Sequence, residues 1–458
     1  MNNTNNNHNR QNTGKYICAL GLAALCALFA IWHIRNPGIT VPGFLAALLS
    51  AALFAAVCLR FVPGWMDFWS QGYKERPPFP GGRPERRETA RIFLVFLGVD
   101  AAVILLMYFL RMAEGYGTSF TGYLDFWRCT DSQHYLDIAQ DWYLSRGPMD
   151  RLVQLVFLPG YPLAVRAMNY IVGNYLYSGL LVAALAFAGA GSMFYRLLRM
   201  DYSRADALRT LEYVCILPGA FFFTAPMSDG LFFLLSVSCI YFARRRSWWL
   251  AGAMGALASF TRSLGVVLLV PVLFELVNSA VNAPPGTRRK NAWGFLSLLV
   301  IPLGFAAYCY INYRVSGDPF KFMQYQREHW GQRLGLFFNT AAYQTENVIG
   351  CLRSHQAESA AGLWLPNVLA DFGALIITAL AARKLRPSYT AYFIAYYVVA
   401  IGATWLLSAP RYMLGLMTVP LAVSALTKKP AADRAAKVIC AALYLLYSVA
   451  FVLRWQVW

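Results

Sequence analysis

Long apolar blocks recur along this chain and limit what it can fold into. They run for about 15–22 residues, long enough for a helix to cross the hydrocarbon core of a bilayer. Of the 458 residues, 58% are hydrophobic and 14% are charged, whereas a soluble domain carries about 25% charged residues. The sequence therefore predicts an all-α polytopic membrane protein.

The hydropathy pattern predicts about 13 spans. Several are short and interrupted by glycine or proline, which is tolerated where helices pack around a cavity. The expected spans are 16–34, 41–61, 91–111, 175–197, 207–225, 229–243, 248–261, 264–280, 292–312, 363–382, 389–407, 412–426 and 436–453.

The ends of the chain and the first loop divide it into four regions. Residues 1–15 are Asn-rich and predict a disordered tail. Residues 16–62 hold two additional N-terminal spans, 63–90 form a basic cytoplasmic loop, and 91–458 form the membrane core. Tyr16–Ile34 lacks a cleavage motif and is expected to stay as an anchor.

Basic residues cluster in alternate loops. The formal net charge is +18, and in a membrane protein such charge is expected in cytoplasmic loops rather than on a nucleic-acid surface. With the N-terminus inside, every basic cluster falls on the cytoplasmic side. The clusters are Lys74–Arg91, Arg199–Arg209, Arg244–Arg246, Arg288–Lys290, Arg383–Arg386 and Lys428–Lys437.

Most remaining polar residues belong to the opposite, extracytoplasmic side. A transporter gathers its polar groups near the bilayer midplane, often in two related halves, and no internal repeat is evident here. Polar groups at one membrane face favour an enzyme that acts on a lipid at the interface. They lie in Glu114–Arg166, Ser228-Asp229, Thr261–Gly265, Arg314–Gly362 and Ser408–Met413.

Asp131 opens the stretch TDSQHYLDIAQDWY, residues 130–143. Apolar residues at helical spacing predict an amphipathic helix at the membrane surface. His134 would share a helix face with Asp131. An exposed carboxylate there suits a general base; the alternative is that Thr130 or Asp131 only caps the helix.

Two arginines stand alone near the outer ends of spans. Arg262 lies in ASFTRSLGVV and Arg411, followed by Tyr412, lies in LLSAPRYMLG. A guanidinium matches the oxygens of a phosphate, so both are candidate phosphate ligands. The alternative for Arg262 is a plain turn between two short spans.

Three further stretches are weaker signals. Ser228-Asp229 opens a span, where Asp229 could be a simple N-cap. Gly317–Trp330 is an aromatic and polar loop that could be a plain surface loop. FLPGYP, residues 157–162, predicts a rigid kink before Arg166, although an ordinary loop is as compatible.

Together and in this order, these motifs are similar to those of the GPI second mannosyltransferase (PIG-V-like) family and its bacterial relatives, in the C-type glycosyltransferase superfamily (GT-C). The resemblance spans about residues 91–426. It is carried by Asp131, His134, Tyr135, Ile138-Ala139, FLPGYP, Ser228-Asp229-Gly230-Leu231-Phe232, Thr261-Arg262-Ser263-Leu264-Gly265, Gly317-Asp318-Pro319, Gln326, Trp330 and Arg411-Tyr412.

The chain departs from the family pattern at three positions. The tryptophan that precedes the catalytic aspartate in the family is Thr130 here, although Trp127 is near. A family glutamate is Asp229, and a family asparagine is Leu264. These changes bear on the acceptor or the sugar.

The resemblance implies a GT-C-like helix bundle and an inverting transfer of a sugar, with mannose implied, from a polyprenyl or dolichyl phosphate to a hydroxyl of a lipid or glycan acceptor. Asp131 would be the base, working on the extracytoplasmic side of a bacterial inner membrane or the endoplasmic reticulum. Substrate-binding residues would be His134, Ser228, Asp229, Arg262, Asp318, Gln326, Trp330, Arg411 and Tyr412.

No nucleotide-sugar site or DxD pattern is evident in the outer loops, which predicts no metal and no cofactor. Expected partners are the lipid-linked donor, the acceptor and membrane lipids, without nucleic acid. The competing interpretations are a polyprenyl-lipid transporter or flippase, and a non-catalytic partner of another glycosyltransferase.

Two of the nine cysteines, Cys129 and Cys351, lie in predicted outer loops. That side of the membrane is oxidising in a periplasm or an endoplasmic reticulum lumen. They could form a disulfide that ties the loop of Cys351 to the helix of Asp131, or remain unrelated free thiols, since sequence does not give the geometry.

Overall fold

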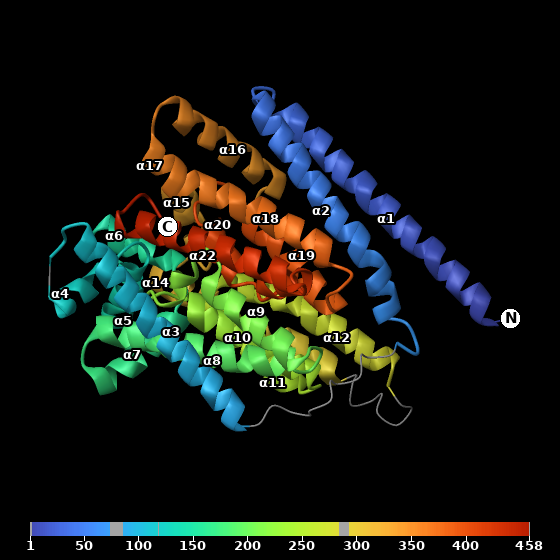
Figure 1. Cartoon of the computed structure of the whole chain (residues 1–458), viewed down its shortest axis with the longest axis horizontal. Helices are drawn as coiled ribbons and strands as arrows, with labels where there is room; N and C mark the ends of the chain where they lie inside the picture. Colours follow the sequence, from blue (N-terminus) through green and yellow to red (C-terminus); the bar gives the residue numbers. More distant parts are fainter. Residues whose placement is uncertain (1, 74–85, 118, 284–292, 458) are drawn as a thin grey trace.

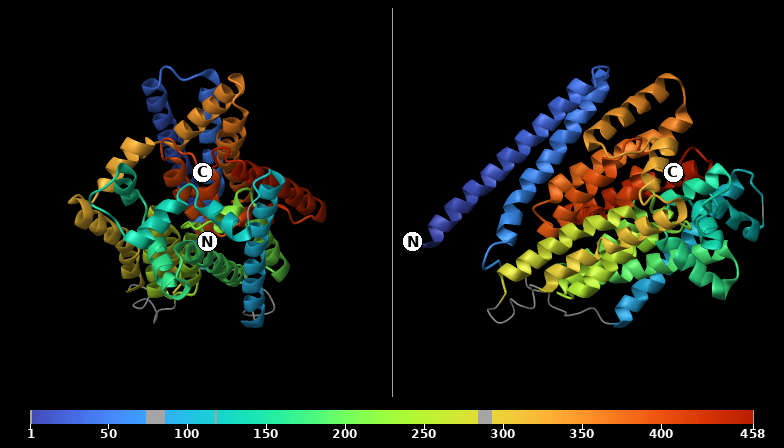
Figure 2. Two further views of the ribbon diagram at one scale, coloured as in Figure 1. Left: turned by 90° about the vertical axis from the view of Figure 1, so that its left-hand side faces the viewer. Right: turned by 180° about the vertical axis from the view of Figure 1, so that it is seen from behind.

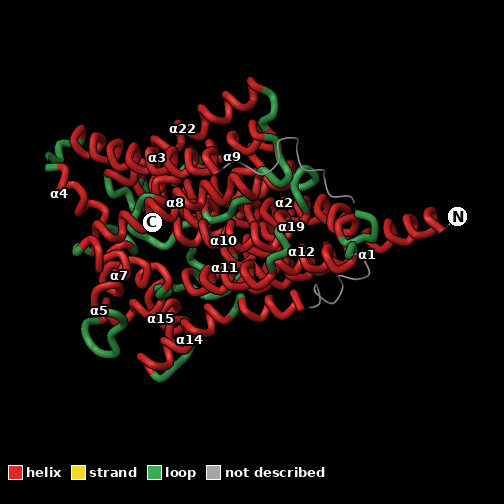
Figure 3. The backbone as a smooth tube through the Cα atoms, turned by 90° about the horizontal axis from the view of Figure 1, so that it is seen from below, coloured by secondary structure: helices red, strands yellow, loops and turns green. Residues whose placement is uncertain are grey.

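A computed structural model of the chain describes residues 2–73, 86–117, 119–283 and 293–457. Within these ranges it is all-helical, apart from one isolated bridge between Leu334 and Ala403 (Figures 1 and 3). The first half contains α1 (Asn2–Arg35), α2 (Val41–Phe68), α3 (Arg86–Ala113), α4 (Phe120–Leu124), α5 (Ser132–Asp141), α6 (Met149–Leu152), α7 (Gly160–Val172), α8 (Tyr175–Leu198), α9 (Arg204–Ile216), α10 (Asp229–Arg244) and α11 (Trp248–Thr261).

The second half continues the bundle, and short irregular helices connect the longer ones throughout the chain. It contains α12 (Leu269–Val281), α14 (Leu303–Ser316), α15 (Lys321–Trp330), α16 (Phe337–Arg353), α17 (Ala357–Ser359), α18 (Leu365–Ala381), α19 (Pro387–Ile401), α20 (Ala409–Leu414), α21 (Thr418–Leu426) and α22 (Pro430–Val452). The short helices are η1 (Asp125–Trp127), η2 (Val153–Val156), η3 (Ala220–Phe223), η4 (Ser263–Leu268), η6 (Phe295–Val300) and the π-helical η7 (Ala360–Trp364).

In the described ranges, eight helical stretches are long and apolar enough to cross a bilayer, or nine if a bent pair counts as one span. The polytopic, all-α prediction is therefore confirmed, and the eight stretches match eight of the about 13 expected spans. The other five expected spans are α9, α10, α11, α19 and α21, which have 9 to 16 residues. In the expected span 207–225, Pro218 and the left-handed Gly219 separate α9 from η3, because neither residue favours continuing a helix.

The bent pair contains the FLPGYP stretch. Met149–Val156 and Gly160–Val172 meet at 109° across a break of at most four residues, which agrees with the predicted kink. The Tyr161 hydroxyl donates to the Gly179 carbonyl at 2.8 Å, and Arg166 Nε donates to the Ala139 carbonyl at 2.6 Å. These bonds tie α7 to both α8 and α5.

The N-terminal addition is a helical hairpin, α1 and α2, that lies along one flank of the bundle (Figure 2). It contacts α16, α18 and α19 through α2, and Trp32 Nε1 donates to Asn339 Oδ1 at 2.8 Å. Helix α1 begins at Asn2, so the segment expected as a disordered tail is helical in the structure. Extending a helix that has already formed adds one hydrogen bond for each residue fixed.

A buried ionic cluster joins the ends of α8, α10 and α19 to the middle of α12. Arg386 donates to both oxygens of Glu275, at 2.7 and 2.8 Å. Arg244 pairs with Asp201 through Nη2 at 2.8 Å, and its Nε lies 3.7 Å from Glu275. All four side chains are at most 9% exposed. Of the basic clusters, most of Lys74–Arg91 and all of Arg288–Lys290 lie outside the described residues.

Helix α10 connects this ionic cluster to the polar loops around Asp229. It has 16 residues, from Asp229 to Arg244, and is therefore about 24 Å long at 1.5 Å per residue. Arg244 belongs to the ionic cluster, whereas Asp229 belongs to the polar loops described below. The two charged regions thus occupy opposite ends of a helix that is buried along most of its length.

Removing one charge from the ionic cluster should destabilise the fold. Glu275→Gln leaves two buried guanidiniums with only Asp201, and breaking a buried ion pair costs about 3–5 kcal/mol. We expect a clearly lower thermal unfolding midpoint in detergent. The matched control is Glu212→Gln, because Glu212 is 54% exposed beside Lys437 and such surface pairs contribute about 0–1 kcal/mol. Equal midpoints for the two variants would contradict the structural role of the cluster.

Candidate active site

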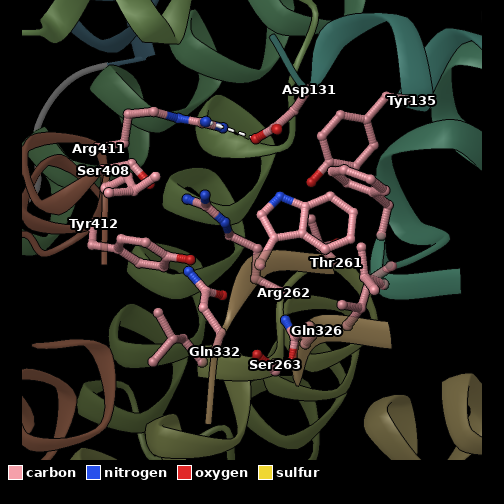
Figure 4. Close-up of a pocket in the computed structure, with 16 residues that line it drawn as sticks. Asp131, Tyr135, Thr261, Arg262, Ser263, Gln326, Gln332, Ser408, Arg411 and Tyr412 are labelled. Atoms are coloured by element: carbon pink, nitrogen blue, oxygen red, sulfur yellow. Dashed lines mark hydrogen bonds and ion pairs between the residues drawn. The ribbon is translucent and has the colours of Figure 1, made fainter. Parts of the chain in front are cut away.

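Four charged residues from distant parts of the sequence meet at the N-terminal end of α10, and Figure 4 shows three of them, Asp131, Arg262 and Arg411. Asp131 directly precedes α5, and Asp229 is the first residue of α10. Arg262 follows the last residue of α11, and Arg411 lies in the short helix α20. Each is at a helix end or in a short helix, where the chain can leave regular packing and aim a side chain at a common point.

The four side chains form a continuous series of ion pairs. Arg262 Nη1 donates to Asp229 Oδ1 at 2.8 Å. Arg411 Nη2 donates to Asp229 Oδ2 at 3.1 Å, and Arg411 Nη1 donates to Asp131 Oδ2 at 2.7 Å. Buried charges of opposite sign compensate one another in this way. The predicted site residues Asp131, Asp229, Arg262 and Arg411 are therefore brought together.

The capping alternatives do not describe these aspartates. Both stand at a helix start, yet the described structure has no side-chain cap hydrogen bond at either α5 or α10. Their carboxylates face the arginines instead. Thr130 has a left-handed backbone (φ 50°), which is uncommon for a threonine and forms part of the sharp entry to α5.

Burial separates the two carboxylates. The side chain of Asp229 is 2% exposed and that of Arg411 is 3% exposed, whereas that of Asp131 is 33% exposed. Asp229 engages both arginines with its two oxygens. It therefore positions the guanidiniums from behind, while Asp131 is the carboxylate that meets solvent.

Asp131 and the two arginines line one pocket, which Figure 4 shows. Most of its remaining lining is aromatic, amide or hydroxyl. Among the other predicted site residues, Gln326, Trp330 and Tyr412 line it. Lining residues that the sequence did not single out as site residues are Tyr135, Val156, Phe157, Leu158, Thr261, Ser263, Leu264, Gln332, Leu407 and Ser408.

Four predicted site residues stand outside the lining: Asp229, which lies behind the arginines, and three others. His134 stacks on Phe157, with ring centroids 4.8 Å apart. The Ser228 hydroxyl lies 3.0 Å from that of Tyr135. Asp318 accepts from the backbone of Phe320 at 2.8 Å, so it shapes the turn before α15. These residues support the walls or the neighbouring loop.

The expected amphipathic helix is α5, and its apolar face packs against protein. Tyr135, Leu136, Ile138 and Ala139 are buried, and α5 contacts α7 and α8. Burial raises the pKa of Tyr135 to about 12, so its hydroxyl stays protonated near neutral pH. The helix therefore holds Asp131 against the bundle and is not free on the membrane surface.

The cysteines near the site are free thiols. Cys129 and Cys351 are both buried and unbridged, and they belong to separate hydrophobic clusters. The structure therefore agrees with the alternative that Cys129 and Cys351 are two unrelated free thiols. Burial raises the pKa of the Cys129 thiol, which makes it less reactive.

In the described ranges, no three His, Cys, Asp or Glu side chains are grouped to hold a metal ion. The absence of an essential metal stays a prediction, because the arrangement of the protein alone does not test it.

No protein-family model matches the sequence, and no curated protein matches it. The chain is similar to the solved structure of ArnT from Cupriavidus metallidurans bound to undecaprenyl phosphate, with 15% identity, coverage of 79% of this chain and 75% of that chain, and a TM-score of 0.48. It is also similar to the archaeal oligosaccharyltransferase AglB from Archaeoglobus fulgidus, solved with an inhibitory peptide and a dolichol-phosphate. There the identity is 14%, the coverage 79% and 56%, and the TM-score 0.38. Such similarity is too loose to transfer a reaction to this chain.

The turn that carries Arg262 depends on Gly265. A Cβ there would lie 2.2 Å from the backbone nitrogen of Ser259, and backbone atoms cannot move aside easily. Gly265→Ala should therefore displace the turn and lower the thermal unfolding midpoint, since overpacking costs about 1–3 kcal/mol. Gly373→Ala in α18 is the control, because open space surrounds that position. An unchanged midpoint for Gly265→Ala would show that the turn is not constrained in this way.

Proposed function

We propose that this chain is an integral membrane glycosyltransferase of the C-type superfamily. It moves a sugar from a polyprenyl or dolichyl phosphate donor to a hydroxyl of a lipid or glycan acceptor, with Asp131 as the base. The observation that supports this most is the set of ion pairs described above. It presents one partly exposed carboxylate and two arginines to a single pocket.

The chemistry of such a donor needs one base. The acceptor hydroxyl attacks C1 of the sugar, the new C1–O bond forms, and the bond from C1 to the phosphate oxygen breaks with inversion. The lipid phosphate leaves as an anion and needs no proton from an acid. The hydroxyl proton passes to Asp131, which is within the pocket and 33% exposed.

The two arginines are suited to the departing phosphate. Arg262 uses Nη1 for Asp229, so its Nε and Nη2 can serve a ligand. In the described structure Arg411 Nε is buried without a partner, and a buried donor of this kind favours an incoming acceptor atom. Donors already aimed at a developing negative charge stabilise it in the transition state.

The pocket wall is suited to a sugar. Trp330 and Phe157 lie near each other, with centroids 6.2 Å apart, and supply apolar faces. Gln326, Gln332 and Ser408 supply amide and hydroxyl groups that can bond sugar hydroxyls. Mannose, as the resemblance to the PIG-V-like family implies, is the sugar we propose to test first.

The charge distribution supports an extracytoplasmic site. Arg244 and Arg386 lie at the end of α10 where basic loops meet, and basic loops favour the cytoplasm. Asp229 begins α10 at the other end. A pocket beside Asp229 would then open toward the periplasm or the lumen of the endoplasmic reticulum.

The decisive assay uses purified protein in detergent or membranes. Polyprenyl-phosphate mannose labelled in the sugar is supplied with a lipid extract, and the label is followed. Appearance of the label on a second lipid or glycan supports transfer, and parallel donors with other hexoses identify the sugar. If the label stays on the polyprenyl lipid for every donor, or only changes membrane leaflet, the chain is a transporter or a non-catalytic partner instead.

Asp131→Asn should abolish transfer while the protein still folds and binds the donor. The amide keeps the size of the side chain but cannot accept the proton, and general base catalysis contributes about 10²–10⁴-fold to the rate. The measurement is initial transfer rate at saturating donor. Asp125→Asn is the control, because Asp125 is 68% exposed beside Arg128. Retention of half the activity in Asp131→Asn would remove Asp131 as the base.

Arg262→Lys and Arg411→Lys should both weaken the donor interaction although each keeps its positive charge. Lysine cannot reproduce the planar fork that binds two oxygens at once. Donor titrations should show a raised KM, a lowered kcat, or both. Arg314→Lys on α14 is the matched control, since Arg314 is exposed, does not line the pocket and donates a hydrogen bond to the Tyr310 hydroxyl. Wild-type donor affinity in both site variants would contradict the assignment of Arg262 and Arg411 as ligands of the donor phosphate.

A further inference from the structure

The charges of the site are already balanced before any substrate arrives. Arg262 and Arg411 provide two positive charges, and Asp131 and Asp229 provide two negative charges. They are joined by three ion pairs of 2.8, 3.1 and 2.7 Å. An incoming lipid phosphate adds negative charge beside them. It must either accept repulsion from a carboxylate or replace one as partner of a guanidinium.

Only one of the two carboxylates is placed to be replaced. Asp229 is 2% exposed and its two oxygens hold two different arginines. Asp131 is 33% exposed, its single described ion pair is with Arg411, and it lines the pocket. Displacing Asp229 would leave the buried Arg262 without its described carboxylate partner and would take one of two partners from Arg411. Displacing Asp131 leaves both arginines paired with Asp229 and exposes Asp131 to the pocket solvent.

Resting on the function proposed above, we propose that the lipid phosphate of the donor and Asp131 compete for Arg411. The phosphate takes the Arg411 Nη1 position that Asp131 Oδ2 holds in the structure. Asp131 then turns from a guanidinium partner into an unpaired carboxylate that faces the acceptor hydroxyl. No bond to carbon or phosphorus changes in this exchange; one ion pair replaces another.

The exchange couples donor binding to the base. While the pocket lacks donor, the carboxylate is engaged by Arg411. When the phosphate is bound, the same carboxylate is released at the moment when an acceptor proton has to be removed. Asp229 keeps Arg411 in place during the exchange through Nη2. The donor therefore binds before the acceptor is activated.

The competition makes a prediction that a simple base does not. Removing the charge of Asp131 should tighten binding of a lipid phosphate, although transfer is lost. The probe is farnesyl phosphate, titrated against purified full-length protein in detergent. We expect Asp131→Asn and Asp131→Ala to bind it roughly tenfold more tightly than the wild type, where tenfold corresponds to one unit in log Kd.

Three controls separate competition from other effects. Asp131→Glu keeps the competing charge, so its affinity should stay near that of the wild type. Asp125→Asn removes a carboxylate of the same loop that is paired with Arg128 instead, so it should also leave the affinity unchanged. Farnesol, which lacks the phosphate, should bind all variants alike, and inorganic phosphate shows whether the headgroup suffices.

The outcomes distinguish this inference from the proposed function. Equal or weaker binding of farnesyl phosphate by both Asp131→Asn and Asp131→Ala, in protein that unfolds at the wild-type temperature, overturns the competition while leaving the transferase proposal intact. Tightening in one correctly folded neutral variant supports it. Absence of farnesyl phosphate binding in the wild type and in every variant overturns both.

Discussion

The site depends on the two ion pairs that the Arg411 guanidinium forms. One of its terminal nitrogens binds Asp131 and the other binds Asp229, so it joins the start of α5 to the start of α10. Arg262 reaches the same Asp229 from the end of α11. Without this shared guanidinium, two buried or half-buried carboxylates would repel each other at the pocket wall. The charges thus fix the relative positions of segments that share no regular backbone pairing.

Helix α10 connects that constraint to the rest of the bundle. Its first residue belongs to the site and its last belongs to the buried cluster of Asp201, Arg244, Glu275 and Arg386. Both ends are thereby held by ionic contacts, while its middle packs against α8 and α11. A helix of 16 residues is short for a membrane span. A charged residue at each of its two ends fits a helix that just crosses the apolar layer.

The fold class and the charged residues of the site could be predicted, because a lone charge in an apolar chain is a strong signal. Asp131, Arg262 and Arg411 stood out for that reason. Their pairing could not be predicted, since Asp131 and Arg411 are 280 residues apart in sequence and each arginine had several possible partners. Gln332 and Ser408 were missed because neutral polar residues in loops are common. The breaks within spans could not be placed, because apolar runs do not reveal where proline and glycine divide them.

The three departures from the family pattern have different positions in the structure, and so different consequences. Trp127 is fully buried and donates to the Tyr123 hydroxyl at 3.1 Å, so it packs in the core and does not replace a tryptophan beside Asp131. Asp229 binds both arginines at the start of α10 through a side chain one methylene shorter than that of a glutamate. Leu264 lines the pocket where the family has an amide, so one hydrogen-bonding group is replaced by an apolar surface. Of the three positions, Leu264 is the one that lines the pocket, so under the proposed function it is the change that a bound sugar or acceptor would contact directly.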